Sequence, residues 1–503
     1  MEYLLIFKNE KKMKKIKILI LSAFLLTTYS CSEDDLNQFP DYGQGIQDGI
    51  NPIKDAVTMQ KVLIGMYQQM STENSFASTV INVGNVASDE FFVSSNNSGY
   101  FLTSSNLSWT PSSSDFTAEY DELYDVVSQA NLVLNSSIEE TSVVKGYKGQ
   151  AYTARGMAFL YLAMGWAENP TSGKNQEYGI ALPTGEFNAY AKFPRSTVEA
   201  TYAQIISDLE KGIELSDENP TSKAYLSATA ARLLLAKAYL WKGDYTNAIK
   251  YANETLNNKP SSFSLLQKSE IEEYFYGETE ASFENQPETV WEVGLTNLNN
   301  PGPNYTMGVL YDYLDPMNTT TTETGLNTRR SILARANVVS GYSDNDERKK
   351  LFVADTRSYD SPAGYFINKY RKTIKEGNSY VQYIGNVKVL RLSEALFIKW
   401  EAMAKSGQGS TALTELNDFA TERGGTTYSG DALTSVLAEK QKEFAGEGHR
   451  FYDLKRNNLS INRLTNCNSN CSVSSGDKLF VFPIPSYSLN NNTTITQYPG
   501  WGN

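Results

Sequence analysis

Apolar and small residues recur with a helical period along much of the chain, most clearly between residues 228 and 260. One stripe at three- and four-residue spacing consists of Ala228, Ala231, Leu235, Ala238 and Tyr239. A second stripe consists of Ala248, Ile249, Ala252 and Leu256, and Pro260 follows it. Between them, Gly243 suits a left-handed helix cap and Asp244 suits the start of the next helix. The pattern therefore predicts two amphipathic helices folded back on each other.

This helix pair resembles one tetratricopeptide repeat. The positions expected of that repeat are occupied by Leu235, Ala236, Tyr239, Ala248, Ala252 and Pro260. The same period predicts helices at 54–70 and 120–134, and two further pairs: 149–166 with 196–215, and 390–404 with 411–422. Three such pairs are enough to stack around a continuous core. The predicted fold is mainly α, a right-handed superhelical scaffold of tetratricopeptide-like helical pairs.

Two stretches interrupt the helical period. Residues 82–111 are rich in Ser, Asn and Gly with interspersed aromatic residues, and long loops of this kind are often functional. Residues 261–387 break the helical period with the strand-like segment 289–293, a tyrosine-bearing loop, a Thr-rich tract at 319–322 and the stretch 380–387. They predict an irregular subdomain with short strands. The expected organisation is a helical scaffold over 54–260 with a ligand-loop insertion at 82–111, the loop-rich subdomain over 261–387, and a C-terminal helical region over 388–503.

The composition excludes several functions. A net charge of −12 and a pI near 4.9 argue against a nucleic-acid partner, because phosphate binding needs a basic surface. The chain has one histidine, His449, which argues against histidine-based metal clusters and a Ser-His-Asp triad. We expect His449 to be a partly exposed residue at a helix end without a chemical role. No metal or cofactor is predicted.

The first 30 residues have the pattern of an export signal. Five lysines between residues 11 and 17 precede the apolar run 18–26, which is too short to span a bilayer. The segment ends in Thr28-Tyr29-Ser30-Cys31 and resembles a bacterial lipobox, although Thr28 and Tyr29 depart from the usual pattern. The resemblance implies cleavage before an acylated Cys31. The alternative is an ordinary signal followed by an incidental cysteine.

The residues after Cys31 fit a surface tether. Ser32-Glu33-Asp34-Asp35 resembles the acidic surface-export signal of Bacteroidetes lipoproteins. The polar, Gly- and Asp-rich chain that follows predicts a flexible leash, so residues 31–53 are expected to form a lipid-anchored tether.

The remaining two cysteines, Cys467 and Cys471, lie four apart in a polar loop. In an exported protein this arrangement favours a local disulfide. A zinc site is the alternative, but it would need two further ligands that the sequence barely offers.

A longer resemblance begins with residues 438–456, AEKQKEFAGEGHRFYDLKR. This stretch is similar to the signature of the SusD/RagB family of outer-membrane lipoproteins. The matching positions are Glu439, Glu443, Phe444, Glu447, Gly448, Arg450, Asp453, Leu454 and Arg456, whereas Lys440 stands where arginine is usual. Other matches follow in the family's order at 124–134, 151–162, 193–212, 390–407 and 482–501.

The charges in this signature have a structural interpretation. Acids and arginines at helical spacing suit ion-pair networks that tie the last helix to the scaffold. A catalytic pair of carboxylates, as in glycosidases, is the alternative. The structural interpretation is favoured because acids with arginine neighbours are more often paired than poised for proton transfer.

The family resemblance implies a lipoprotein on the outer surface of the outer membrane that captures oligosaccharides and passes them to a SusC-type TonB-dependent transporter, without catalysing a reaction. Sugar binding needs aromatic faces and flanking polar groups, and the two irregular stretches supply both. The candidate ligand residues are Asp89, Tyr100, Phe101, Asn106, Trp109, Asn304, Tyr305, Tyr311 and Tyr313. Four other tryptophans are expected to serve packing: Trp166, Trp241, Trp291 and Trp400. Two alternatives remain, which are capture of peptides or another nutrient and a surface hydrolase.

Overall fold

The computed structural model describes residues 51–186, 188, 190–320 and 322–502. The predicted signal, Cys31 and nearly all of the predicted tether lie outside this range. The described residues of 53–186 and 190–503 form one compact unit, which contains all of the described helices and strands.

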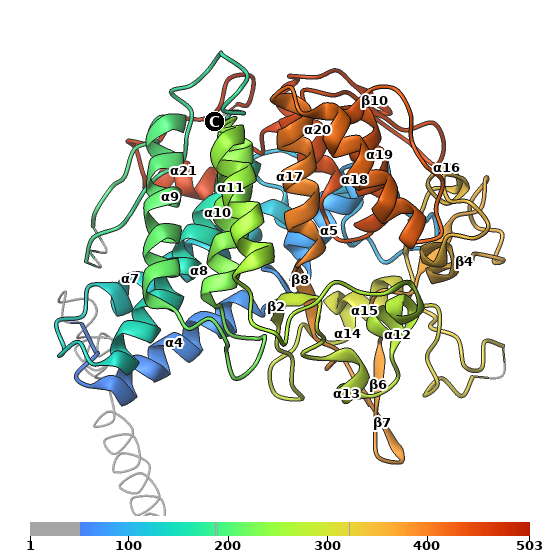
Figure 1. Ribbon diagram of the computed structural model, residues 1–503, viewed down its shortest axis with the longest axis horizontal. Coiled ribbons are helices and arrows are strands. Elements are labelled where there is room, and N and C mark those ends of the chain that lie inside the picture. The colour runs from blue at the N-terminus through green and yellow to red at the C-terminus, as the bar shows by residue number, and fades with distance from the viewer. Residues whose placement is uncertain (1–50, 187, 189, 321, 503) are drawn as a thin grey trace, which may run out of the picture. The chain divides into compact units, whose positions relative to one another are not determined.

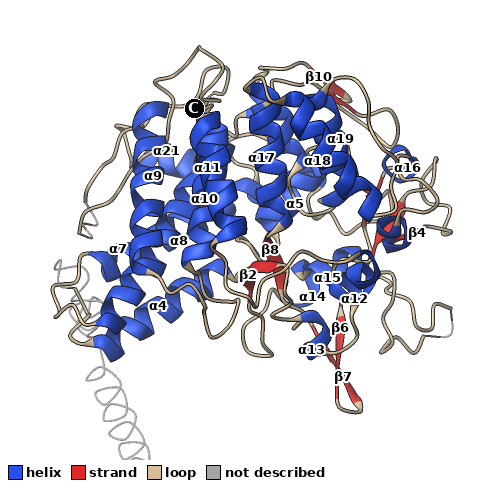
Figure 2. Cartoon of the chain, viewed as in Figure 1, coloured by secondary structure: helices blue, strands red, loops and turns tan. Residues whose placement is uncertain are grey.

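Long helices dominate the unit and pack in the order in which they occur in the chain (Figures 1 and 2). Each of the following contacts the next: α4 (Ala56–Met70), α7 (Ser114–Leu134), α8 (Ser142–Trp166), α9 (Val198–Leu215), α10 (Ala228–Lys242), α11 (Tyr245–Asn257), α17 (Ser393–Lys405), α18 (Gly409–Glu422) and α19 (Ala432–Glu443). The mainly helical fold is therefore confirmed, and the three predicted pairs are α8–α9, α10–α11 and α17–α18.

The turn between α10 and α11 has the predicted chemistry. Gly243 adopts the left-handed conformation with φ of 82°, which costs glycine little. The Asp244 side chain accepts a hydrogen bond from the backbone N–H of Asn247 and so caps α11. These two local signals end one helix and begin the next, which folds the pair back on itself.

A buried ion pair connects three of the scaffold helices. Arg155 of α8 donates to both carboxylate oxygens of Asp208 in α9, at 2.8 and 2.6 Å. The same guanidinium donates to Asn131 Oδ1 of α7 at 2.7 Å. Bidentate pairing of this kind supplies hydrogen-bond acceptors to a buried guanidinium group and fixes the orientation of the arginine side chain.

Residues 261–387 contain short strands and helices joined by loops. One antiparallel sheet has the strand order β1 (Phe91–Val93), β3 (Ile332–Ala334), β5 (Tyr365–Ile367) and β4 (Phe352–Ala354). Two-stranded pairs are β2 (Thr289–Val293) with β8 (Val387–Arg391), β6 (Thr373–Glu376) with β7 (Ser379–Gln382), and β9 (Ile461–Asn462) with β10 (Ser472–Val473). The predicted strand 289–293 is confirmed. In the stretch 380–387, residues 380–382 belong to β7 and Val387 begins β8.

The remaining elements are short. The α-helices are α5 (Thr79–Val86), α6 (Leu102–Ser105), α12 (Ile271–Tyr276), α13 (Glu280–Phe283), α14 (Gly302–Tyr305), α15 (Met307–Tyr311), α16 (Ala336–Ser340), α20 (Arg450–Arg456) and α21 (Ser486–Asn491). Single 3-10 turns cover Lys268–Glu270, Glu347–Leu351 and Lys478–Phe480.

The stretch 82–111 is less irregular than predicted. All eight residues of α5 are buried, as are the three residues of β1. A helix that is buried on every side shows no polar face, so the sequence pattern conceals it. The ligand-loop portion therefore shrinks to the residues after Val93.

The core of the described residues is one large apolar cluster with three smaller ones: around α17–α19, at Phe92, Leu333 and Phe366, and at Phe283, Ile374 and Ile384. The tryptophans assigned to packing, Trp166, Trp241, Trp291 and Trp400, are all at most 2% exposed, which confirms that assignment.

Candidate ligand-binding site

The signature residues 438–456 form two helices, α19 and α20, rather than the single helix that their spacing suggests. The turn between them contains Gly446 and Gly448, both with φ of 81°. Gly448 also lies against α5, where a Cβ on Gly84 would come within 2.3 Å of the Gly448 carbonyl oxygen. The two glycines thus let the signature turn and α5 touch backbone to backbone.

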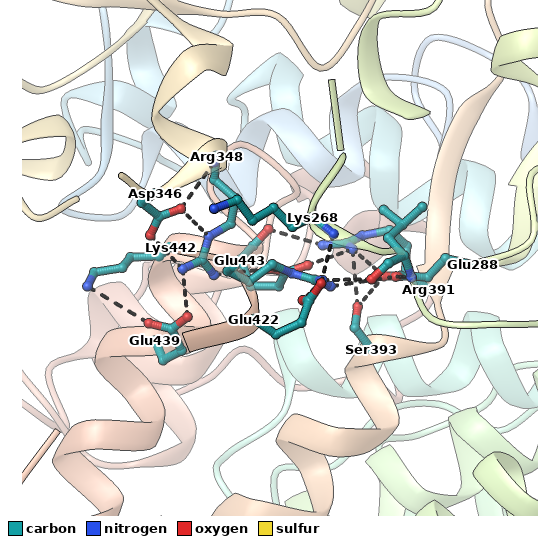
Figure 3. A network of polar contacts seen from close by, with 12 residues as sticks. Lys268, Glu288, Asp346, Arg348, Arg391, Ser393, Glu422, Glu439, Lys442 and Glu443 are labelled. Carbon is teal, nitrogen blue, oxygen red and sulfur yellow. Dashed lines mark hydrogen bonds and ion pairs between the residues drawn. The ribbon is translucent and has the colours of Figure 1, made fainter. Parts of the chain in front are cut away.

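Glu443 is the centre of a buried network of charges (Figure 3). Its carboxylate lies 3.0 Å from Nη1 of Arg391, 3.0 Å from Nη1 of Arg348 and 3.4 Å from Nε of Arg423. Burial alone would raise the pKa of Glu443, but these guanidinium groups outweigh it and hold the pKa below its ordinary value. Glu443 is therefore an ionised structural anion, as the structural interpretation of the signature predicted.

The other signature charges are paired in the same manner. Glu447 binds Arg391 and Lys369, at 2.8 and 2.6 Å. Asp453 binds Lys440 at 2.7 Å and Arg456 at 2.6 Å. Lys440, which replaces the usual arginine, therefore still supplies a buried cation. These contacts join the signature helices to β8 and to the loops of residues 261–387.

His449 directly precedes α20 and is partly exposed, as predicted. Its ring stacks on Phe444 with 4.5 Å between centroids. Burial, together with the cations Lys440 and Lys237, holds the pKa of His449 well below its ordinary value. The imidazole is thus neutral at physiological pH.

Three candidate ligand residues have structural roles. Asp89 is held by both Nε and Nη2 of Arg450, at 2.8 and 3.0 Å. Trp109 is 2% exposed and packs against Phe116, Phe451 and Phe482. Tyr311 is fully buried, and its hydroxyl accepts a hydrogen bond from Asn85. Partners distant in the sequence cover Trp109 and Tyr311, so the expectation that these two rings are exposed is wrong. Asp89 stays partly exposed beside Arg450, and its role in ligand binding stays a prediction.

Tyr100 and Tyr305 bring the two aromatic loops together. Both side chains are partly exposed, and their rings meet edge to face with 4.7 Å between centroids. Tyr305 lies at the end of α14, where its backbone carbonyl accepts a hydrogen bond from Ser78 Oγ at 2.5 Å. Burial, followed by the proximity of Tyr100, Asp115 and Glu73, raises the pKa of Tyr305, so its hydroxyl stays protonated at neutral pH. The pair offers adjacent aromatic surfaces with hydroxyl groups.

Two of the other candidates, Phe101 and Asn304, lie beside this pair, whereas Asn106 and Tyr313 have other partners. Phe101 is buried and meets Tyr305 edge to face at 6.2 Å. Asn304, beside Tyr305, is partly exposed and accepts a hydrogen bond from the exposed Arg329. The backbone carbonyl of Asn106 is bound by the loop that carries Cys467 and Cys471, which form a disulfide with 5.7 Å between their Cα atoms. Tyr313 is partly exposed but packs on Phe366.

Several residues around the site were not anticipated. Arg329 binds Asn304 beside Tyr305, and the charges of Asp115 and Glu73 contribute to the raised pKa of Tyr305. Arg348 and Arg423 complete the Glu443 network. The arginine doublet at 329–330 is the one local sequence signal for Arg329. The sequence does not predict where this side chain lies relative to the tyrosine pair.

Two further observations concern metal binding and membrane-spanning helices. Within the part of the chain that the structure describes, no grouping of three or more His, Cys, Asp or Glu side chains is suited to hold a metal ion. Among the same described residues, no helix combines the length and the apolar character that a membrane span requires.

Together, the stacked helical pairs and the tyrosine pair define a class of protein: an α-helical repeat scaffold with partly exposed aromatic residues on its loops. Comparison with known proteins specifies the family. Residues 45–240 match a SusD-like family described as starch-binding and associating with the outer membrane, and residues 311–501 match the SusD family. The chain belongs to the SusD/RagB family, for which carbohydrate binding at the outer membrane is the family-level function.

Individual relatives are similar to this chain over most of its length. SusD-like protein P2 of Formosa agariphila is 24% identical over 481 residues, which cover 88% of this chain and 91% of the relative. The crystal structure of a putative sugar binding protein from Bacteroides vulgatus has a TM-score of 0.76 at 24% identity, covering 90% of this chain and 99% of that one. A laminarin binding SusD-like protein has a TM-score of 0.69 at 20% identity, covering 89% of this chain and all of the other. These structural likenesses concern the fold.

Proposed function

We propose that this protein is a lipid-anchored, cell-surface receptor that binds oligosaccharides or polysaccharide at Tyr100 and Tyr305. It delivers them to a SusC-type TonB-dependent transporter for import, and it does not alter them chemically. The observation that carries the binding site is the contact of these two partly exposed rings, which come from the two loops that the sequence marks as aromatic. Family membership supports carbohydrate as the ligand class.

The chemistry of the pair suits a sugar. Sugar rings present C–H faces that pack on aromatic rings, and their hydroxyl groups need hydrogen-bond partners at the edges. The two tyrosines carry phenol groups, and Asn304, the chain neighbour of Tyr305, is bound by the guanidinium of the exposed Arg329. The site can therefore offer stacking surface, donors and acceptors to one ligand.

The charged residues of the signature support a non-catalytic role. A glycosidase needs one carboxyl group held protonated as an acid and a second as base or nucleophile. Glu443 has the opposite property, since three arginines keep it ionised. Glu447 and Asp453 are likewise engaged by cations.

The proposal is tested with a glycan panel that includes starch and laminarin, with a peptide panel beside it. We expect a soluble form that starts after Cys31 to bind at least one glycan, and Tyr100→Ala and Tyr305→Ala each to weaken that binding roughly fivefold or more, because a lost aromatic contact is worth about 1 kcal/mol. Tyr225→Ala is the matched control, since Tyr225 also sits in an edge-to-face tyrosine pair, with Tyr67 at 5.4 Å. Binding of peptides alone, or equal weakening by Tyr225→Ala, would contradict the proposal.

Two further measurements address catalysis and delivery. Bound glycan incubated with the protein should be recovered at its original length, whereas shortened products would establish a hydrolase. Affinity capture of the lipidated protein from outer membranes should recover a TonB-dependent barrel, and capture without such a barrel would contradict the transporter partnership.

A further inference from the structure

A short hairpin near the C-terminus lies against the loop that carries Tyr100. Strands β9 and β10 pair antiparallel, and the Cys467–Cys471 disulfide closes the loop between them. At its base, the backbone N–H of Arg463 donates to the carbonyl of Cys471 at 2.8 Å. We call residues 461–473 the disulfide hairpin.

The disulfide hairpin binds three consecutive backbone carbonyls at the end of α6. The carbonyl of Ser105 accepts from Nη1 of Arg463 at 2.5 Å. The Asn106 carbonyl accepts from Ser469 Oγ at 2.8 Å, and the Leu107 carbonyl accepts from Asn470 Nδ2 at 2.9 Å. The last carbonyls of a helix have no partners within the helix, so they depend on groups from elsewhere.

Arg463 also holds the neighbouring helix. It is buried, and its Nε and Nη2 atoms donate to the carbonyls of Ser88 and Ala87 at 2.9 and 2.6 Å, just after the end of α5. One guanidinium group thus fixes the ends of α5 and α6 relative to each other. Arginine suits this role because its donors have a rigid, planar arrangement.

One helical turn transmits this constraint to Tyr100. The backbone N–H of Ser105 donates to the carbonyl of Phe101 at 2.8 Å, and Asn106 donates to Leu102 at 3.0 Å. Phe101 is buried with a φ of 57°, which fixes the direction in which the chain leaves the helix toward Tyr100. The carbonyls held by the hairpin are therefore five to seven residues from the ligand tyrosine.

We infer that the disulfide hairpin is a positioning element for the ligand site, through which glycan affinity depends on the Cys467–Cys471 bond. The disulfide restricts the five-residue loop that carries Ser469 and Asn470, so these side chains reach their carbonyl partners with less loss of conformational entropy. Without the bond, the loop would order less often and the end of α6 would lose its partners. The inference about affinity rests on the proposed function, whereas the inference about α6 does not.

The first test needs no ligand. In the double variant Cys467→Ser/Cys471→Ser, amide hydrogen exchange over residues 102–108 should accelerate at least threefold, while exchange in β2 and β8 should not change. The variant Ser469→Ala/Asn470→Ala keeps the disulfide but removes the side chains that bind the carbonyls of Asn106 and Leu107, and it should act in the same direction. Asn468→Ala, in the same loop, should leave exchange unchanged. Unchanged exchange over 102–108 in both double variants would overturn the inference.

The second test uses starch and laminarin as probes. Reduction of the disulfide should weaken binding of whichever glycan the protein takes by roughly threefold or more. Linkage then requires that saturating glycan shift the thiol–disulfide equilibrium in a glutathione buffer toward the disulfide by the same factor. If the disulfide had no effect on the ligand site, saturating glycan would leave the thiol–disulfide equilibrium unchanged. That result would overturn the dependence of glycan affinity on the disulfide. Failure of both glycans to bind either form would count against the proposed function, and the exchange experiment would still decide the role of the hairpin.

Discussion

Arg450 and Asp89, which are 361 positions apart, form a bidentate ion pair. The Nε and Nη2 atoms of Arg450 lie 2.8 and 3.0 Å from the two carboxylate oxygens of Asp89. The arginine belongs to the family signature and the aspartate follows α5, so the pair joins the C-terminal helices to the start of the first ligand loop. Neighbouring carboxylates raise the pKa of Arg450 despite its burial, with Asp89 the largest contributor among them. The pair gives Arg450 a structural role, because it ties the signature helix α20 to the segment that follows α5.

We expect Arg450 and Asp89 to be strongly coupled in their contributions to the free energy of unfolding. Removing one partner leaves a mostly buried charge without its counter-ion. Arg450→Ala should lower the free energy of unfolding by about 3 kcal/mol. A double-mutant cycle with Asp89→Ala in urea should give a coupling energy above about 1 kcal/mol. The exposed pair Lys211–Glu214 is the control and should give less than about 0.5 kcal/mol. Equal coupling in the two cycles would contradict this prediction.

Glu443→Gln should be more harmful, since it leaves three buried arginines without their shared anion. We expect a loss of about 3–5 kcal/mol in the free energy of unfolding at pH 7. Because the pKa of Glu443 is lowered on folding, its contribution is fully present above the unfolded pKa and is lost as the pH falls below it. Glu422→Gln is the control, because Glu422 also pairs with Arg423 but is 37% exposed. Urea unfolding at pH 7 should therefore separate the two variants, and similar losses would count against a central role for Glu443.

The helical pairs could be predicted because their signals are local. The turn at Gly243 and Asp244 is determined by neighbouring residues, and the apolar stripes of α10 and α11 need only the helical period. Helix α5 was missed for the opposite reason, since its surroundings come from the whole molecule and bury every face.

The same distinction explains the ligand site. Aromatic residues in polar loops were predicted to be exposed, but Trp109 is covered by Phe451 and Phe482, which lie more than 300 positions further along the chain. Tyr100 and Tyr305 are 205 positions apart, so the sequence could place each in an aromatic loop without showing that they meet. Contacts between distant segments decide which loop aromatics face solvent.

Trp109→Ala should therefore destabilise the protein instead of selectively weakening ligand binding. Removing a ring that packs on Phe116, Phe451 and Phe482 should cost about 3–5 kcal/mol in the free energy of unfolding. Trp109→Phe should cost less, because it retains most of the apolar volume. A stable Trp109→Ala variant with impaired glycan binding would return Trp109 to the ligand site.

Cys31→Ala tests the proposed lipid anchor. We expect the variant to leave the membrane fraction, because the acyl chains attached to Cys31 would provide the hydrophobic attachment. Cell fractionation with immunoblotting measures this directly. The double variant Cys467→Ala/Cys471→Ala keeps Cys31 and should remain in the membrane fraction. Membrane attachment of the Cys31→Ala protein would show that the anchor lies elsewhere.

Glu119 of α7 predicts a pH dependence of stability. It is fully buried, and neither carboxylate oxygen has a hydrogen-bond partner among the described residues. Burial, aided by the negative charge of Asp115, raises the pKa of Glu119 to about 8. Because the folded pKa lies above the unfolded value near 4.5, the folded state binds the extra proton between these values, and stability falls as the pH rises through that window.

Glu119→Gln removes this titration, since glutamine resembles the protonated acid and never ionises. Relative to the original protein, the variant should gain stability with increasing pH by up to about 1.4 kcal/mol per unit between pH 5 and pH 8. Urea unfolding at four pH values across this window measures the divergence. Glu199→Gln is the control, because Glu199 is 74% exposed and should give a curve parallel to the original protein. Parallel curves for Glu119→Gln as well would mean that Glu119 is ionised in the folded protein, so that a buried cation or water must reach its carboxylate.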